Sequence, residues 1–145
     1  MPLITPSDQQ RLRDAFAAMT RPVRLLFFTQ TLGCETCLQT RQILDELPLL
    51  SDKIAIDEVN LILEGDKARA YGIDRAPAIA VTYEDQGSQD TRIRFLGAPA
   101  GYEFISLIEA VLLAGGRPPR LSPESHARLA AIDAPVTLRV FTTPT

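Results

Sequence analysis

The 145-residue sequence predicts an α/β domain in which helices cover both faces of a mixed β-sheet. Three observations predict this class. Strand-like apolar runs alternate with segments that repeat apolar residues at helical spacing. The first strand–helix–strand unit implies parallel pairing, because such a connection is a right-handed crossover. The last two strands of the pattern are separated only by a short polar turn, which predicts an antiparallel hairpin.

The first half of the chain carries two predicted strands and two predicted helices. Ser7 is a candidate helix N-cap with Gln10 as its capping-box partner, and Pro22 closes that segment. The apolar run "VRLLFFT" over 23–29 predicts a buried strand, and "KIAIDEVNL" over 53–61 alternates like a second strand. Between these strands, apolar residues recur at helical spacing after the second of two cysteines.

The next part of the chain continues the alternation. "GDKARAYGI" over 65–73 fits a short helix, and "AIAVTY" over 78–83 is a predicted strand. "TRIRFLG" over 91–97 alternates as an exposed antiparallel strand does. Residues 102–114 repeat apolar side chains at helical spacing and are followed by two glycines, which favours an amphipathic helix.

A proline-rich linker over 117–121 then interrupts the pattern. Ser122 and Pro123 fit the N-cap and first position of another helix, which should reach about Ala131. Residues 1–116 are therefore expected to form one domain.

The end of the chain repeats its beginning. "PVTLRVFT" over 135–142 is identical to "PVRLLFFT" over 22–29 at five of eight positions, and each stretch follows a predicted helix. We therefore expect residues 122–145 to be the incomplete start of a second unit, ending before a second cysteine pair. Its lone strand should pair with a sheet edge of its own domain or of a second copy in a homodimer.

Composition excludes several classes of function. The net charge of −3 provides no polycationic face, so nucleic acid is not an expected partner. No apolar stretch approaches the ~20 residues that span a bilayer, so no membrane partner is expected. The N-terminus has neither a basic start nor a long apolar segment, and we expect a cytoplasmic protein. A lone C-x-x-C in that compartment is more often catalytic or metal-binding than structural.

Both cysteines of the chain lie in the segment "GCETC", between a predicted strand and a predicted helix. Cys34 would lie at the helix N-terminus, where amide N–H groups and the helix dipole favour a thiolate. Cys37 lies about one turn further and can resolve a mixed disulfide formed on Cys34. We expect Cys34 to be exposed and Cys37 largely buried. Glu35 and Thr36 are the dipeptide between them.

Other interpretations of the cysteines remain open. A structural zinc site needs four ligands, and besides the two cysteines the chain offers only His126, so no metal is expected. A Cys/His hydrolase would need His126 near Cys34, although its polar neighbours favour a solvated surface position. The two cysteines can also be ordinary buried side chains.

Ala76 and Pro77 directly precede the predicted strand over 78–83. In a fold where the second strand–helix unit leads to this loop, Pro77 can pack opposite Cys34. The backbone of Ala76 can then pair with a substrate polypeptide like an added strand. A trans bond is the base-rate expectation for Ala76–Pro77.

The chain resembles the N-terminal thioredoxin-fold unit of the protein disulfide oxidoreductases, the tandem glutaredoxin-like proteins. The resemblance rests on the cysteine pair, on "YGIDRAPA" over 71–78, on "APAGYEF" over 98–104 and on the tail "VTLRVFTTPT". It implies a thioredoxin-like fold, a cis Ala76–Pro77 bond and thiol–disulfide exchange with protein substrates. It also implies a thioredoxin-reductase-like electron donor and no cofactor besides the Cys34–Cys37 disulfide.

The sequence departs from that family in two respects. The family works with two C-x-x-C units and this chain has one, which puts isomerase activity in doubt. Thioredoxins carry a buried Asp six residues before the first cysteine, where this chain has Phe28. Asp57 or Glu58 can substitute as the proton carrier, unless both belong to a solvated strand face. The alternative function is a non-catalytic thioredoxin-fold module for docking or dimerisation.

Overall fold

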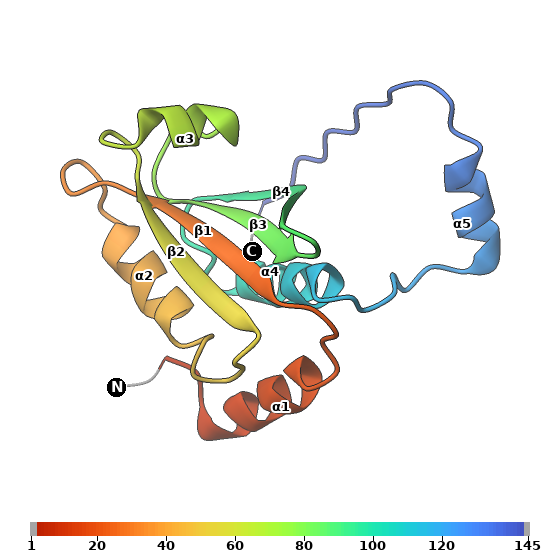
Figure 1. The fold of residues 1–145 in the computed structure, drawn as a ribbon, viewed down its shortest axis with the longest axis horizontal. Helices are drawn as coiled ribbons and strands as arrows, with labels where there is room; N and C mark the ends of the chain where they lie inside the picture. The colour runs from red at the N-terminus through yellow and green to blue at the C-terminus, as the bar shows by residue number, and fades with distance from the viewer. Residues whose placement is uncertain (1–2, 144–145) are drawn as a thin grey trace.

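The computed structural model describes residues 3–143 and contains a four-stranded mixed sheet (Figure 1). Its strands are β1 (Val23–Thr29), β2 (Ile54–Asn60), β3 (Ala78–Glu84) and β4 (Ser88–Leu96), in the spatial order β2-β1-β3-β4. β1 pairs parallel with β2 and antiparallel with β3, and β3 pairs antiparallel with β4. The predicted crossover and hairpin are both confirmed.

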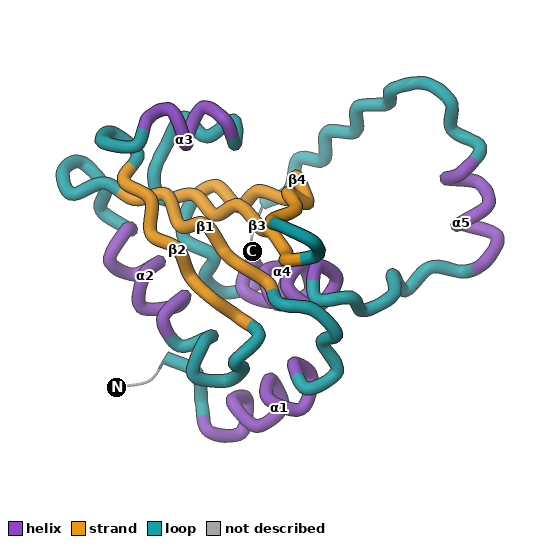
Figure 2. The backbone as a smooth tube through the Cα atoms, in the orientation of Figure 1, coloured by secondary structure: helices purple, strands orange, loops and turns teal. Residues whose placement is uncertain are grey.

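Residues 3–116 contribute four helices. They are α1 (Pro6–Phe16), α2 (Cys37–Asp45), α3 (Gly65–Ala70) and α4 (Tyr102–Ala114). Residues of α1, α2 and α4 share one core cluster, whereas α3 covers the opposite face of the sheet (Figures 1 and 2). The expected α/β class with helices on both faces is confirmed.

The central strand β1 is buried on both faces apart from Arg24 and Thr29, as its mostly apolar sequence predicts. Side chains alternate between the faces of a strand. Leu25 and Phe27 therefore join the cluster formed by α1, α2 and α4, while Leu26 and Phe28 join the cluster under α3. This alternation decides which neighbouring side chains can reach the cysteines.

Helix α1 begins earlier than the sequence pattern suggested. Its N-cap is Thr5, whose hydroxyl accepts a hydrogen bond from the Asp8 N–H at 3.2 Å and donates to the Asp8 carboxylate at 2.7 Å. Pro6 takes the first helical position, where its missing N–H costs no hydrogen bond. The prediction of Ser7 as N-cap was wrong, because Thr5 and Asp8 form the reciprocal cap instead.

The C-terminal segment leaves the sheet and its helices. Ser122 caps α5 (Pro123–Ala130) by accepting from the Ser125 N–H at 3.1 Å, as predicted, but α5 buries none of its residues. The segment beyond α5 is extended and, as far as residue 143, pairs with no strand (Figures 1 and 2). The expectation that residues 136–141 pair with an edge of their own sheet was therefore wrong.

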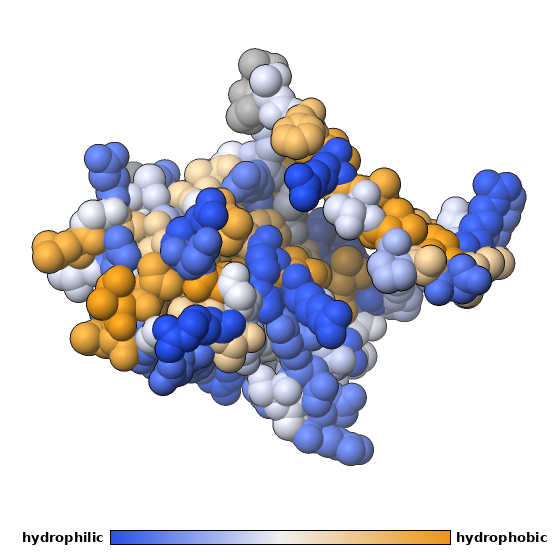
Figure 3. All heavy atoms as spheres, turned by 90° about the horizontal axis from the view of Figure 1, so that it is seen from above, coloured by the Kyte–Doolittle hydropathy of each residue, from blue (hydrophilic) through white to orange (hydrophobic). Residues whose placement is uncertain are grey.

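This arm, which we define as residues 123–143, exposes large apolar side chains. Leu138, Val140 and Phe141 are 86%, 83% and 90% exposed, and apolar atoms follow the arm on the right of Figure 3. A strand is stable only when its backbone groups find a ladder partner. Apolar residues alone therefore did not make this segment a strand.

Within residues 3–143, no helix is long and apolar enough to cross a membrane.

Candidate functional site

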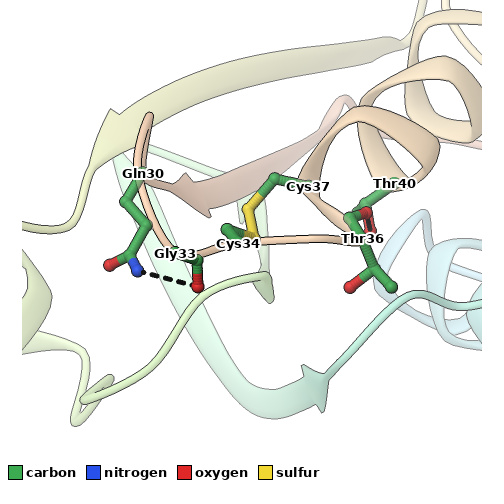
Figure 4. The surroundings of a disulfide bond; sticks show 6 residues. All are labelled: Gln30, Gly33, Cys34, Thr36, Cys37 and Thr40. Carbon is green, nitrogen blue, oxygen red and sulfur yellow. Dashed lines mark hydrogen bonds between the residues drawn. A yellow bond between two sulfur atoms is a disulfide. The ribbon is translucent and has the colours of Figure 1, made fainter.

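The two cysteines form a disulfide at the start of α2 (Figure 4). Cys34 lies in the loop after β1, and Cys37 is the first residue of α2. Their Cα atoms are 5.5 Å apart. The strand–loop–helix sequence thus brings both sulfur atoms together, as predicted.

The two sulfur atoms have different environments. Cys37 is 7% exposed and belongs to the core cluster that α2 shares with α1 and α4. Cys34 is only partly buried and packs against the edge of the same cluster. The prediction of a buried Cys37 is confirmed, whereas Cys34 is less exposed than predicted because it packs against the core cluster.

The dipeptide between the cysteines forms a turn that leads into α2. Glu35 and Thr36 are both exposed, and the Thr36 carbonyl accepts the Thr40 N–H at 2.9 Å and the Thr40 hydroxyl at 2.8 Å. The Thr36 side chain makes no capping hydrogen bond within the described structure. The amide N–H groups of the first turn therefore leave the positive end of the helix dipole beside the disulfide.

The loop before the motif is held by a local contact. The Gln30 side-chain amide donates to the Gly33 carbonyl at 3.4 Å (Figure 4). Gly33 has a φ of +72°, a backbone conformation that other residues adopt at a cost. This turn places Cys34 just before the N-terminus of α2.

The Ala76–Pro77 peptide bond is cis, as the resemblance implied. Pro77 is buried, and its carbonyl accepts the Gly97 N–H at 2.9 Å, which ties this loop to the end of β4. Ala76 is partly exposed and packs against the same core cluster as Cys34. The fold thus places this loop and the first cysteine around one cluster.

A pocket opens beside the disulfide, between α2 and the end of β2. Of the described residues that line it, only Arg41 and Glu58 are charged. Arg41 was not identified from the sequence, although its position one turn after Cys37 is a signal that could have found it. The full lining is Thr29, Gln30, Thr31, Cys34, Cys37, Leu38, Arg41, Glu58 and Asn60.

The structure separates the two acidic candidates. Glu58 lies opposite Phe27 in the β1–β2 register and reaches the pocket, whereas Asp57 pairs with Arg24 at 2.8 Å. The position six residues before Cys34, where thioredoxins carry the buried Asp, is Phe28. Phe28 faces the α3 side of the sheet, away from the cysteines. Phe27, the preceding residue of the strand, shares a core cluster with Cys37, because the loop length before the helix decides which strand face lies beneath it.

His126 is not part of this site. It is exposed on α5, a helix with no buried residue, whereas Cys37 lies in the core. Within residues 3–143, no group of three or more His, Cys, Asp and Glu side chains could hold a metal ion. The structure therefore gives no support to a Cys/His nucleophile.

Fold and disulfide together define the chain as a thioredoxin-fold protein with a C-x-x-C redox site. No family model matches the sequence. The AhpF component of alkyl hydroperoxide reductase from Xanthomonas campestris pv. phaseoli is 36% identical over 107 residues, which is 73% of this chain and 17% of that protein. The chain thus spans about a sixth of that relative's length.

Solved structures confirm the fold. The NTD_N/C domain of alkylhydroperoxide reductase AhpF from Enterococcus faecalis (V583) matches with a TM-score of 0.78 and 30% identity, over 88% of this chain and 60% of that one. A protein disulfide oxidoreductase from Aeropyrum pernix K1 matches with a TM-score of 0.72 and 22% identity, over 88% and 54%. The resemblance noted from the sequence is thereby confirmed at the level of the fold.

Proposed function

We propose that the chain is a thiol–disulfide oxidoreductase that exchanges electrons with protein disulfides through Cys34 and Cys37. The observation that carries this proposal is the asymmetry of the disulfide, with Cys34 partly exposed in the loop before α2 and Cys37 buried at the first position of that helix. An exposed sulfur can be reached by a substrate, and a shielded neighbour completes the exchange. No further cofactor takes part in the proposed reaction.

The proposed cycle begins when a donor dithiol reduces the Cys34–Cys37 disulfide with two electrons. The Cys34 thiolate then attacks a substrate disulfide, forming a mixed disulfide and releasing one substrate thiolate. Cys37 loses its proton and attacks the Cys34 sulfur, which restores the internal disulfide and releases the second substrate thiolate. The donor of the first step is proposed to be a thioredoxin-reductase-like protein.

The substrate polypeptide is proposed to lie along the loop that contains Ala76 and Pro77. Ala76 is partly exposed, and its backbone can pair with an extended chain. On the other side of the site, the loops after β1 and β2 expose apolar side chains, which lie at the left end of the molecule in Figure 3. These apolar residues, which can contact a partly unfolded substrate, are Leu32, Ile62 and Leu63.

Dithiothreitol-dependent reduction of insulin tests the proposal, with Cys34→Ser as the control. The wild type is expected to accelerate insulin precipitation and the variant is not. Equal turnover would favour the alternative, a non-catalytic docking or dimerisation module. The exposed apolar side chains of the arm are the observation that favours this second candidate.

We also propose that residues 122–145 begin a second thioredoxin-like unit. The repeat of 22–29 in 135–142 supports this division. Residues 1–121, with the linker included, are about 83% of the chain, so the match to the E. faecalis domain over 88% of it extends beyond the linker. Fusing a second copy of residues 23–116 in frame at residue 136 tests this division. If residues 122–145 begin a second unit, the completed unit should protect the arm from proteolysis.

A further inference from the structure

Arg41 and Glu58 form an ion pair in the pocket beside the disulfide. The guanidinium Nη1 of Arg41 lies 2.7 Å from Oε2 of Glu58, and Arg41 also lies 3.5 Å from the Asp45 carboxylate. Arg41 is one turn after Cys37 on α2, so the two side chains share one side of the helix. The pair thus connects the helix that carries the buried cysteine to strand β2.

The contribution of this ion pair to the stability of the fold is small. The side chains of Arg41 and Glu58 are 54% and 44% exposed, and pairs with such exposure contribute about 0–1 kcal/mol. Its distinguishing feature is its place. Glu58 lines the same pocket as Cys34 and Cys37, and its side chain is exposed enough to exchange protons with water.

A second ion pair, which joins β2 to β1, supplies an internal comparison. Asp57 is the neighbour of Glu58 in β2, is 40% exposed and accepts from Arg24 at 2.8 Å. Arg24 also bridges to Glu84, as Arg41 does to Asp45. Because adjacent residues of a strand face opposite sides, Asp57 is separated from the disulfide by the sheet.

Cys37 needs a proton acceptor in the proposed exchange. Burial disfavours the charged form of a thiol, so the Cys37 thiolate does not form readily without a base in reach. The proton must leave before the sulfur attacks, and no other carboxylate lines the described pocket. A half-exposed carboxylate can accept this proton across the pocket and pass it to solvent.

We propose that Glu58 accepts the Cys37 proton during resolution of the mixed disulfide, and that Arg41 is the positioning residue that keeps Glu58 in the pocket. This inference rests on the proposed function. The Cys37 proton moves to the Glu58 carboxylate, and the Cys37 thiolate attacks the Cys34 sulfur. The bond between Cys34 and the substrate sulfur breaks, and the departing thiolate carries the electron pair and can take up a proton.

A two-phase release assay separates the steps. The reduced full chain is mixed with the chromogenic disulfide of thionitrobenzoate, and stopped-flow absorbance is recorded between pH 4 and pH 9. The first release of thionitrobenzoate reports attack by Cys34, and the second reports attack by Cys37. Wild type is compared with Glu58→Gln and with the matched control Asp57→Asn.

We expect Glu58→Gln to slow the second release by about a hundredfold or more at neutral pH and to remove its acid-side inflection. The first release should be unchanged, and Asp57→Asn should leave both releases as in wild type. Arg41→Gln should shift the inflection of the second release, and Arg41→Lys should restore part of it, because a cation is retained.

The outcomes distinguish this inference from the proposed function. If wild type shows no first release, or only as much as Cys34→Ser, the proposed function fails and this inference falls with it. If the first release is normal but Glu58→Gln and Asp57→Asn give the same second release and pH profile, this inference alone is overturned.

Discussion

Cys34 and Cys37 share one disulfide, yet Cys37 is buried in the core cluster and Cys34 lies partly exposed at its edge. The separate roles proposed for the two residues, which the sequence motif presents as a symmetrical pair, rest on this difference in exposure.

Single replacement of each cysteine should separate the two roles. Cys37→Ser leaves the Cys34 nucleophile without its resolving partner, so attack of Cys34 on the disulfides of oxidised insulin should leave mixed disulfides that accumulate. Cys34→Ser leaves only a buried thiol and should trap none. Non-reducing electrophoresis with mass spectrometry measures both, and equal trapping by the two variants would contradict the assignment.

Asp90 and Arg94 should make stability depend on pH. Arg94 donates to both carboxylate oxygens of Asp90, at 2.8 and 2.7 Å, and chiefly these hydrogen bonds lower the pKa of Asp90. The folded-state pKa is therefore below the unfolded one. Its stabilising contribution is present at neutral pH and is lost as the pH falls through the folded-state pKa.

We expect Asp90→Asn to lower the free energy of unfolding at pH 7 by about 1 kcal/mol, since the pair is partly exposed to solvent. The difference from wild type should shrink as the medium is acidified below the folded-state pKa. Urea unfolding at several pH values measures this, with exposed Asp52→Asn as the control. A difference that is independent of pH would show that Asp90 acts through packing instead.

Gly116 lies against Thr20 where α4 ends beside the segment that leads into β1. A Cβ at Gly116 would lie 2.2 Å from the Thr20 hydroxyl oxygen, and the φ of Gly116 is +104°. Gly87, in the β3–β4 turn, has a similar φ of +117° but open space around it. The two positions therefore differ in steric contact more than in backbone strain.

Gly87→Ala should lose about 1–3 kcal/mol through strain alone. Gly116→Ala should lose at least about 1 kcal/mol more, because the added methyl group displaces Thr20 from the α4 terminus. Thermal and chemical unfolding of both variants measure the difference. Equal losses would mean that Thr20 moves aside without cost.

The exposed arm should drive self-association. The apolar face of residues 136–141 lacks a partner within the described chain, and an unpaired extended segment can add to the edge of a sheet in another copy. We expect a homodimer at micromolar concentration. Replacing Leu138 and Val140 together with Asp should shift it toward monomer, as measured by analytical ultracentrifugation.

A matched control for this replacement is available in the domain formed by residues 3–116. Leu49 is also exposed and apolar but lies after α2, away from the arm. Leu49→Asp should leave the sedimentation coefficient unchanged. A wild-type chain that remains monomeric, with rapid hydrogen exchange after residue 134, would contradict the prediction of a dimer.

The sequence by itself determined the local elements of this protein. The apolar run of 23–29 became β1 and the helical pattern of 102–114 became α4, because burial patterns and helix termini act over neighbouring residues. The motif between strand and helix likewise predicted the disulfide between Cys34 and Cys37.

Tertiary structure decided which side chains meet across those elements. Loop length decides that Phe27, and not Phe28, lies toward Cys37. Strand register decides that Glu58, and not Asp57, reaches the pocket. No local sequence pattern encodes either property. It also decided that the arm stays unpaired, because a strand exists only where a partner satisfies its backbone hydrogen bonds.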